Sequence, residues 1–273
     1  MKKIALITGA SSGMGKSTAF HLQQKGYTVY GAARRLEEMK DLEAAGMHRI
    51  ALDLTEDASI VRCVQEILEK EGQIDVLINN AGYGSYGSVE DVPLEEAKRQ
   101  FEVNLFGLAR ITQLVLPSMR KHQSGRIVNI TSMGGKVYTP LGSWYHATKH
   151  ALEGWSDCLR LELKPFGIDV VIVEPGGIKT PWGIIAAENL VKTSGNGAYA
   201  HFAAKTAEAM NKMYRGKMLT DVDVLGKVIA KAASVKRPKI RYVKGFMAKP
   251  ALFIRKWFGD WLFDKIIMTQ FKG

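Results

Sequence analysis

The chain has 273 residues, of which 46% are hydrophobic, and a net charge of +11. This hydrophobic content supports a folded core and excludes a mainly disordered protein. The two cysteines, Cys63 and Cys158, are too few for a disulfide framework or a cysteine metal site. The lysines are scattered and no nucleic-acid-binding motif accompanies them, so we expect no nucleic-acid partner.

The amino terminus resembles the start of a secretion signal, with two lysines before an apolar run. That run stops after four residues, at Thr8, which is too short for a signal. No stretch reaches the length of a membrane-spanning helix. We therefore expect a cytoplasmic protein without a stable membrane anchor.

Short β-branched runs alternate with helix-periodic stretches from Lys3 to about Val173. The predicted strands are Ile4–Thr8, Thr28–Ala33, His48–Leu52, Asp75–Asn79, Arg126–Ile130 and Asp169–Val173. The predicted helices are Met14–Lys25, Leu36–Gly46, Asp57–Glu71, Pro93–Leu116 and a helix from Tyr145 to about Lys164. This alternation predicts an α/β fold: a three-layer, doubly wound parallel sheet with helices on both faces, in a single domain over residues 1–273.

The rhythm changes after Gly176. Residues 177–216 are rich in Ala, Lys, Gly and Met and predict helices and loop without a strand. An insertion of this kind beyond the ligand-binding edge suits a substrate lid, although a plain surface excursion would give the same pattern. A helix over Asp221–Ala233 and a last strand over Ile240–Val243 follow.

The carboxyl-terminal extension, residues 248–271, is aromatic and helix-periodic. One apolar stripe contains Ile254, Trp257, Phe258, Trp261 and Leu262. We expect this stripe to pack over the substrate site or against a partner subunit in preference to a membrane.

Tyr145 and Lys149 stand four residues apart, so they share one face of their predicted helix. An ammonium beside a phenol stabilises the phenolate, so we expect the pKa of Tyr145 to be lowered towards a range useful for proton transfer. Ser132 lies at the carboxyl end of the Arg126–Ile130 strand, the edge at which open parallel sheets bind ligands.

Spaced glycines join the first strand to the first helix. They let the backbone turn sharply and approach a pyrophosphate, which then lies at the positive end of the helix. The residues of this turn are Gly9, Ser11, Ser12, Gly13, Met14 and Gly15.

The end of the second strand distinguishes the two nicotinamide cofactors. An acid there would bind the ribose hydroxyls of NAD, but the chain has Arg34 and Arg35. A guanidinium suits the 2′-phosphate of NADP, so we expect NADP(H) to be preferred over NAD(H). A solvated pair of helix-start arginines is the alternative. Asp53 could accept a hydrogen bond from the adenine amine or serve only as a helix-start residue.

Together these motifs resemble the classical short-chain dehydrogenase/reductase family over nearly the whole chain. The resemblance rests on the glycine turn, on Asn79–Gly82, on Asn104, and on Ser132 thirteen residues before Tyr145. The segment Pro175–Thr180 completes the order. A weaker resemblance, to the hydroxysteroid and retinol dehydrogenase branch of the family, rests on residues 241–245 and 263–264.

The resemblance implies a Rossmann-type fold and a role for each matching residue. Tyr145 would be the general acid or base, Lys149 would lower its pKa and hold the nicotinamide ribose, and Ser132 would bind the substrate oxygen. Asn104 would hold a water that links Lys149 to solvent. The further cofactor contacts that it implies are Leu54, Asn80, Ala81, Gly82, Pro175, Gly176, Ile178 and Thr180.

The sequence therefore predicts an NADP(H)-dependent oxidoreductase that interconverts an alcohol and a ketone or aldehyde. A lipophilic, steroid- or retinoid-like substrate would suit the apolar residues of the lid, which could equally be lid core: Trp182, Ile184, Ile185, Phe202, Met210 and Met213. A non-catalytic NADP-sensing protein, or a sugar-nucleotide epimerase or dehydratase, is the alternative. Family resemblance implies a homodimer or homotetramer.

Overall fold

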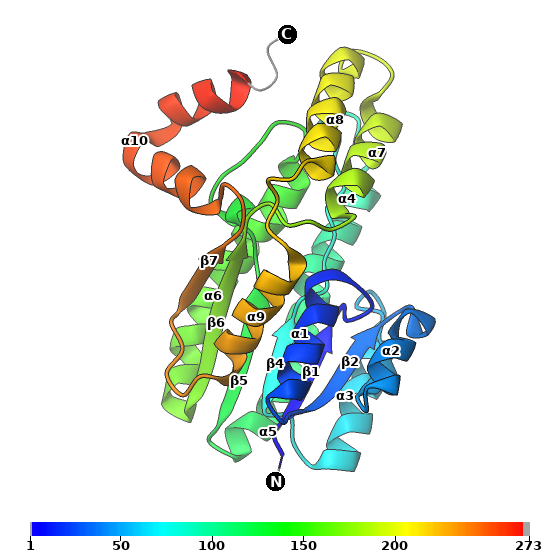
Figure 1. Cartoon of the computed structure of the whole chain (residues 1–273), viewed down its shortest axis with the longest axis vertical. Coiled ribbons are helices and arrows are strands. Elements are labelled where there is room, and N and C mark those ends of the chain that lie inside the picture. Colours follow the sequence, from blue (N-terminus) through cyan, green and yellow to red (C-terminus); the bar gives the residue numbers. More distant parts are fainter. Residues whose placement is uncertain (1, 270–273) are drawn as a thin grey trace.

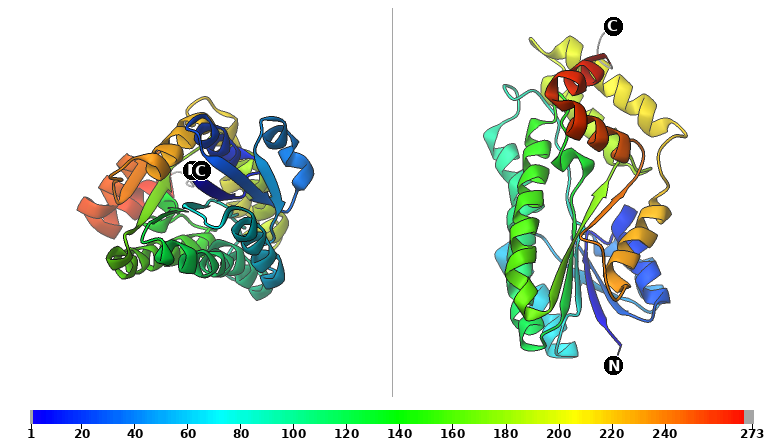
Figure 2. Two further views of the ribbon diagram at one scale, coloured as in Figure 1. Left: turned by 90° about the horizontal axis from the view of Figure 1, so that it is seen from below. Right: turned by 90° about the vertical axis from the view of Figure 1, so that its left-hand side faces the viewer.

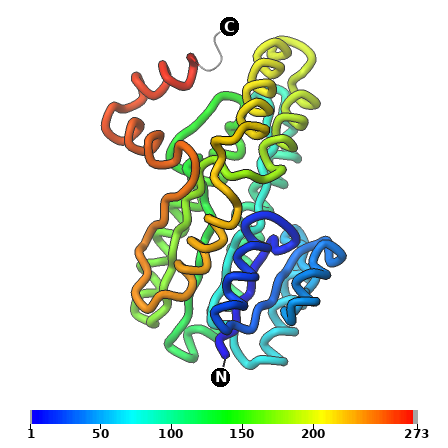
Figure 3. The backbone as a smooth tube through the Cα atoms, viewed as in Figure 1, coloured from blue at the N-terminus to red at the C-terminus, as the bar shows by residue number. Residues whose placement is uncertain are grey.

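The computed structural model describes residues 2–269, which build one seven-stranded parallel sheet in the order β3-β2-β1-β4-β5-β6-β7 (Figure 1). The strands are β1 Ile4–Thr8, β2 Thr28–Ala33, β3 His48–Ala51, β4 Val76–Asn79, β5 Gly125–Ile130, β6 Ile168–Pro175 and β7 Arg241–Lys244. The order reverses between β1 and β4, which creates the topological switch point at which open sheets of this kind bind ligands. Figure 3 follows the backbone from β1 at one end of the molecule to α10 at the other.

Ten α-helices are described: α1 Gly13–Gln24, α2 Lys40–Ala44, α3 Asp57–Glu71, α4 Leu94–Phe101, α5 Gly107–Lys121, α6 Ser143–Leu163, α7 Trp182–Ser194, α8 Ala200–Arg215, α9 Val222–Ser234 and α10 Ala248–Thr269. Short 3-10 turns occupy Leu36–Met39, Met133–Gly135 and Lys164–Phe166, and a π-helical turn occupies Glu102–Phe106. The predicted three-layer, doubly wound fold in a single domain is confirmed.

Two hydrophobic clusters hold the three layers together. On one face of the sheet, Ala5 and Ile7 of β1 pack against α1 and α9; on the other, Ile4 and Leu6 pack against α3, α5 and α6 (Figure 2). Adjacent residues of β1 thus serve opposite layers, as the pleat of a strand requires. Both faces being covered explains why the strands are continuous apolar runs.

The stretch predicted as one helix, Pro93–Leu116, is divided into α4, the π-helical turn and α5. The prediction also ended too early, because α5 continues through Pro117 to Lys121. A proline costs a helix one backbone hydrogen bond. Met119, beyond the proline, is fully buried against the sheet, and this packing outweighs that loss.

The aromatic extension differs from its prediction. Its residues 248–269 form α10, which bends at Gly259, where the backbone is non-helical, and its residues 270–271 lie outside the described residues. The exposed fractions of Trp257, Phe258 and Trp261 are 67%, 56% and 70%, so the predicted stripe does not pack over the site within this chain. Phe263 makes the buried contact instead, edge-on to the ring of Tyr138. Within residues 2–269, no helix is long and apolar enough to cross a membrane.

Candidate active site

Ser132 and Tyr145 meet at the carboxyl edge of the sheet. Ser132 directly follows β5, and its Oγ accepts a hydrogen bond from the Gly134 backbone N–H at 2.9 Å, which starts the 3-10 turn. His146, next to Tyr145 on α6, fastens that turn. Its Nδ1 lies 2.9 Å from the Gly134 carbonyl oxygen, and its Nε2 accepts from the Thr139 N–H at 3.0 Å. Sequence reasoning missed this role of His146, because a lone histidine has no spacing signal.

The pKa of Tyr145 is raised in this structure, so the prediction that it would be lowered is wrong. Burial raises the pKa, because the charged phenolate loses hydration, and a hydrogen bond with Ser132 lowers it in part. The Lys149 ammonium does not reach the phenol; it donates to the Ile130 carbonyl oxygen at 3.0 Å. The four-residue spacing placed both groups on one face, but it could not fix the direction of the lysine side chain.

Lys149 is 6% exposed, and its burial lowers the pKa to about 8 against an opposing effect of the Glu153 carboxylate. Burying the charged ammonium is costly, so the Lys149 amine holds its proton more weakly than an exposed lysine does. The Lys149 Nζ lies beside Gly82, because a Cβ built on that glycine would be 3.6 Å from it. The lysine head therefore lies against the backbone that follows β4, within the predicted cofactor edge.

This low pKa makes a prediction for stability. Between pH about 8 and pH 10.5 the unfolded chain keeps a proton on Lys149 that the folded chain has released. The free energy of unfolding should therefore rise with pH across that interval, and Lys149→Met should abolish this contribution. Urea unfolding at several pH values measures the free energy of unfolding of the wild type and of Lys149→Met, and the second is subtracted from the first. The difference should increase with pH; a difference that stays flat across the interval would contradict the assignment.

Asn104 is fully buried in the π-helical turn between α4 and α5. Its Oδ1 accepts from the Tyr83 N–H at 3.0 Å, and its Nδ2 donates to the Tyr83 carbonyl oxygen and to Thr148 Oγ1 at 2.9 and 3.1 Å. The side chain thus ties the segment after β4 to α6, one residue before Lys149. Within the chain, Asn104 thus pairs with the backbone of Tyr83 and with Thr148. The bound water stays a prediction.

The glycine turn has the geometry of an anion cradle. Gly9 and Gly13 have φ values of 68° and 56°, a region that favours glycine. A Cβ on Gly15 would lie 2.5 Å from the Gly9 carbonyl oxygen, so the turn closes tightly. Ser12, the N-cap of α1, makes no side-chain cap, and the first turn contains no acid. The amide groups at this helix start are therefore available to a phosphate.

The segment after β4 supports this turn directly. Asn80 Nδ2 donates to the carbonyl oxygens of Thr8 and Gly9 at 3.0 and 3.3 Å, and the N–H groups of Asn80 and Ala81 both donate to Thr8 Oγ1 at 3.0 Å. A Cβ on Gly9 would lie 2.8 Å from Ala81 Cα. Asn80 and Ala81 therefore shape the cradle, whatever contact they make with a cofactor.

Arg34 and Arg35 are exposed just beyond the carboxyl end of β2. Arg35 reaches back to the glycine turn, with 3.5 Å between its Nη2 and Ser11 Oγ. Arg34 forms no ion pair with any residue in the described range 2–269, and its charge acts on Asp53. Arg35 thus lies beside the cradle and Arg34 acts on Asp53, both at the strand end where a 2′-phosphate would lie.

Asp53 closes a local turn in the loop before α3 and is not the N-cap of that helix, which is Glu56, so the helix-start role is not observed and the adenine contact stays a prediction. Its Oδ1 accepts from the Thr55 N–H and hydroxyl at 3.0 and 2.8 Å. Burial raises the pKa of Asp53, but these bonds and the Arg34 charge lower it further, so the carboxylate is charged. Leu54 is buried, and its carbonyl oxygen would collide with a Cβ on Gly107, so the glycine lets α5 approach this backbone closely.

The segment Pro175–Thr180 leaves β6 and crosses towards the cradle. Gly176 N–H donates to the Lys244 carbonyl oxygen at 2.9 Å, which extends the pairing with β7. Ile178 is 5% exposed, and Thr180 lies opposite the cradle, 3.7 Å from a Cβ built on Gly13. The structure thus places the four predicted cofactor residues of this segment on the same edge as the glycine turn: Pro175, Gly176, Ile178 and Thr180.

The lid residue Trp182 touches the catalytic tyrosine candidate. Its ring centroid lies 5.1 Å from that of Tyr145, and Tyr86 and Tyr214 lie 5.9 and 6.3 Å from it. A Cβ on Gly84 would collide with Trp182 at 2.5 Å, so the backbone after β4 lies flat against the indole. An aromatic wall therefore borders the Tyr145 phenol. Among the other predicted lid residues, Phe202 and Met210 pack against the same cluster, whereas Ile185 is exposed.

A buried network of ion pairs connects the elements that carry the site, and the sequence analysis did not predict it. Glu174 of β6 is inaccessible to solvent and lies 2.6 Å from Lys136 Nζ and 3.0 Å from Arg241 Nε. Arg241 also contacts Glu153 of α6 at 3.1 Å. The network joins β6, β7, α6 and the turn after Ser132, just below the crossing segment.

Removing one member of this network is expected to destabilise the fold strongly. Glu174→Gln removes the buried carboxylate that binds Lys136 and Arg241, which should lower the free energy of unfolding by about 1.5–3 kcal/mol, since both cations keep Glu153 as a partner. Asp57→Asn, which weakens the exposed ion pair with Arg110, should cost much less. Urea unfolding of both variants measures the difference; equal losses would show that Glu174 contributes no more than a surface pair.

Comparisons with known proteins agree with this geometry. The sequence model of the short chain dehydrogenase family matches residues 3–189. A probable short-chain type dehydrogenase/reductase, VdlC of Helicobacter pylori, is 37% identical, with 98% of each chain covered. The 3-ketodihydrosphingosine reductase of Bacteroides thetaiotaomicron is 36% identical, with 97% of this chain and 95% of the relative covered. The NADPH-dependent 3-dehydrocapnine reductase of Ornithobacterium rhinotracheale is 33% identical, covering 99% and 98%.

A solved short-chain dehydrogenase from Streptomyces avermitilis superposes with a TM-score of 0.80 at 32% identity, covering 98% of both chains. Other solved structures with this fold are complexed with either NADP or NAD, so the fold alone does not select between the two. The chain belongs to the short-chain dehydrogenase/reductase family and is an oxidoreductase that uses a nicotinamide dinucleotide.

Proposed function

We propose that the protein is an NADP(H)-dependent reductase or dehydrogenase that interconverts a ketone or aldehyde and an alcohol. The observation that carries this proposal is the meeting of Ser132, Tyr145 and Lys149 with the glycine cradle at one edge of the sheet. A protein that only senses a cofactor has no need of a phenol hydrogen-bonded to a serine beside that cradle.

The residues present suit a dinucleotide. The amides at the start of α1 would bind the pyrophosphate, and Arg34 and Arg35 would bind the 2′-phosphate of NADP. The name of the relative from Ornithobacterium specifies NADPH, which supports the same preference. Gly82, Pro175, Gly176, Ile178 and Thr180 would border the nicotinamide end, with Lys149 at its ribose.

Each chemical role follows from the placement of one side chain. The reduced nicotinamide, when bound, supplies the hydride that the carbonyl carbon accepts. Tyr145 then gives its phenolic proton to the carbonyl oxygen, and the O–H bond of the tyrosine breaks as that of the product forms. Ser132 donates a hydrogen bond to the same oxygen and stabilises its developing charge. Because the Lys149 ammonium does not contact the phenol, Lys149 and Asn104 would return a proton to it from solvent through water, and the oxidation would reverse every step.

We infer a lipophilic substrate from the aromatic wall. Trp182, Tyr86 and Tyr214 would contact the substrate on the side away from the cradle. Two relatives are named for reduction of a 3-keto or 3-dehydro compound, which supports a ketone as the reacting group. Residues 177–216 would then act as the lid over this substrate, because α7 carries Trp182 across the site.

Fluorescence titration with NADPH and NADH, followed by turnover of a panel of long-chain ketones, aldehydes and steroids, tests the proposal. Tighter binding of NADPH and turnover of a lipophilic ketone are the expected results. Binding without any turnover would favour a sensor, and binding of neither cofactor would overturn the assignment.

We also infer a homo-oligomer and a cytoplasmic location. An apolar groove lined by Leu94, Phe101, Phe106 and Trp144 lies between α4 and α6, and Leu94 and Phe106 are more than half exposed there. A second copy of the chain would cover these side chains. Light scattering of the purified protein measures the assembly directly, and a monomer at micromolar concentration would contradict it.

A further inference from the structure

The outer face of α10 is aromatic and exposed. Phe253, Trp257, Phe258 and Trp261 have exposed fractions of 58%, 67%, 56% and 70%, and we call these four residues the α10 aromatic face. Phe253 contacts both Trp257 and Phe258 by ring packing, so the face is continuous across the first segment of the helix. Exposed apolar patches of this kind mark interaction sites.

The opposite side of α10 holds the helix on the body of the protein and uses its acids. The Tyr138 hydroxyl lies 2.9 Å from Asp260 and 2.8 Å from Asp264, and the Phe263 ring meets the Tyr138 ring edge-on. Arg255 pairs with Asp260 and covers the same ring. Both carboxylates of α10 therefore accept a hydrogen bond from Tyr138.

Three lysines accompany the aromatic face. The Lys256 ammonium lies 5.4 Å from the centroid of the Trp257 ring, and that of Lys265 lies 3.7 Å from the Trp261 ring. Lys249 is exposed at the start of the helix. None of the three forms an ion pair within the described part of the chain. The free side of α10 thus combines indole and phenyl rings with uncompensated positive charge.

We propose that the α10 aromatic face binds the surface of an anionic lipid membrane, with α10 lying in the interfacial plane. Tryptophan and phenylalanine enter the boundary between headgroups and acyl chains, and lysines beside them meet anionic headgroups. The attachment is peripheral, because α10 is bent at Gly259 and carries charges along its length. This inference differs from the expectation drawn from the sequence stripe, which favoured packing over membrane contact.

Charge selects this occupant over a second copy of the chain. A symmetric pairing of two α10 aromatic faces would bring Lys256 and Lys265 of both copies together. Asp260 and Asp264 would offset this repulsion only in part, since both already accept a hydrogen bond from Tyr138 and Asp260 is paired with Arg255 of its own chain. An anionic lipid surface supplies the missing negative charge, and the net charge of +11 adds a general attraction to it.

The position of α10 gives this docking a consequence. α10 and the lid helices α7 and α8 project beyond the same end of the sheet, on either side of its carboxyl edge (Figure 1). A membrane that binds α10 would therefore lie at the end of the molecule where substrate enters. The inference itself does not rest on the proposed function, because membrane binding is measured without cofactor or substrate.

Vesicle flotation tests the proposal on the full chain. Wild type is expected to bind vesicles that contain phosphatidylglycerol, to bind pure phosphatidylcholine vesicles weakly, and to lose affinity as salt is added. Two double variants, Trp257→Ser with Trp261→Ser and Lys256→Glu with Lys265→Glu, should each bind about tenfold less tightly or worse. Their thermal unfolding should match wild type, since all four side chains lie on the exposed side.

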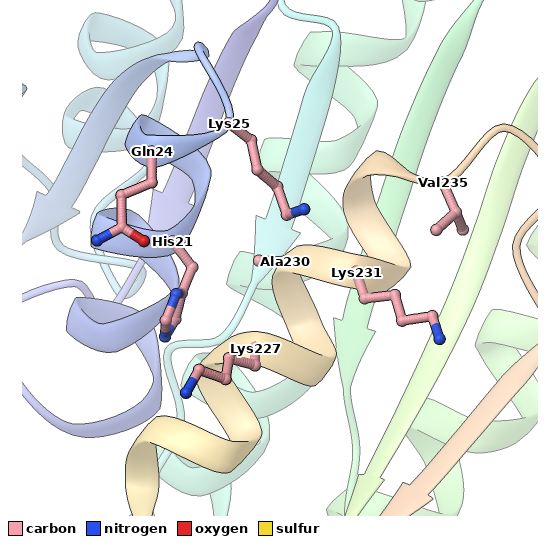
Figure 4. Close-up of a pocket in the computed structure, with 7 residues that line it drawn as sticks. All are labelled: His21, Gln24, Lys25, Lys227, Ala230, Lys231 and Val235. Atoms are coloured by element: carbon pink, nitrogen blue, oxygen red, sulfur yellow. The ribbon is translucent and has the colours of Figure 1, made fainter.

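Matched control variants distinguish an effect of the α10 aromatic face from an effect of net charge or of exposed apolar side chains in general. Lys25→Glu with Lys231→Glu makes the same change in net charge in the hollow between α1 and α9 (Figure 4). Val89→Ser with Leu161→Ser removes two other exposed apolar side chains. Both controls should bind vesicles like wild type. The proposal is overturned if wild type does not bind anionic vesicles, if the controls lose as much binding as the α10 variants, or if those variants only convert a dimer into a monomer.

Discussion

Tyr145→Phe is expected to bind NADPH like wild type and to lower kcat by about 10²–10⁴-fold. The phenyl ring keeps its contacts with Trp182 and Tyr86, so the aromatic wall stays in place. Only the proton and the hydrogen bond with Ser132 are lost. Because burial raises the pKa of Tyr145, the phenol is protonated at neutral pH and suited to act as an acid in reduction.

Tyr27→Phe is the matched control for this change. Tyr27 precedes β2 at the amino edge of the sheet, opposite the site, and its phenol pKa is likewise raised by burial. Its loss should leave both cofactor binding and kcat unchanged. Turnover is followed by the absorbance of NADPH at saturating substrate. A Tyr145→Phe enzyme that keeps wild-type kcat would remove the phenol from the mechanism.

The strands were predictable because both faces of the sheet are covered. The central strands are short, mainly apolar runs, and all seven strands lie within two residues of their predicted bounds. The glycine turn was predictable for a related reason, because the positive φ at Gly9 and Gly13 demands residues without a Cβ. These signals are local, so a single sequence carries them.

What could not be predicted depends on side chains that meet from distant segments. The direction of the Lys149 head is set by the Ile130 carbonyl oxygen, and burial sets the pKa of Tyr145. The π-helical turn that brings Asn104 beside α6 has no sequence signature. The aromatic stripe of the extension gave the right helix but not its buried side, because Tyr138, more than a hundred residues earlier, decides which face turns inward.

Arg34→Asp is expected to weaken NADPH binding by about 100-fold and to leave NADH binding unchanged or improved. Arg34 is exposed beside the cradle, and its charge acts on Asp53. The change removes charge-assisted hydrogen bonds to the 2′-phosphate and adds a second carboxylate that repels it. For NADH, the new carboxylate can accept hydrogen bonds from the ribose hydroxyls, as an acid at this strand end does in NAD-binding sites.

Arg237→Asp makes the same change in charge at an exposed position in the turn between α9 and β7, at the opposite edge of the sheet. It should leave both dissociation constants unchanged, which separates a contact at the 2′-phosphate from the general field of a basic protein. Fluorescence titrations with both cofactors at one ionic strength give the ratio of dissociation constants. If Arg34→Asp and Arg237→Asp shift this ratio equally, Arg34 is a surface residue and cofactor preference must come from Arg35 beside Ser11.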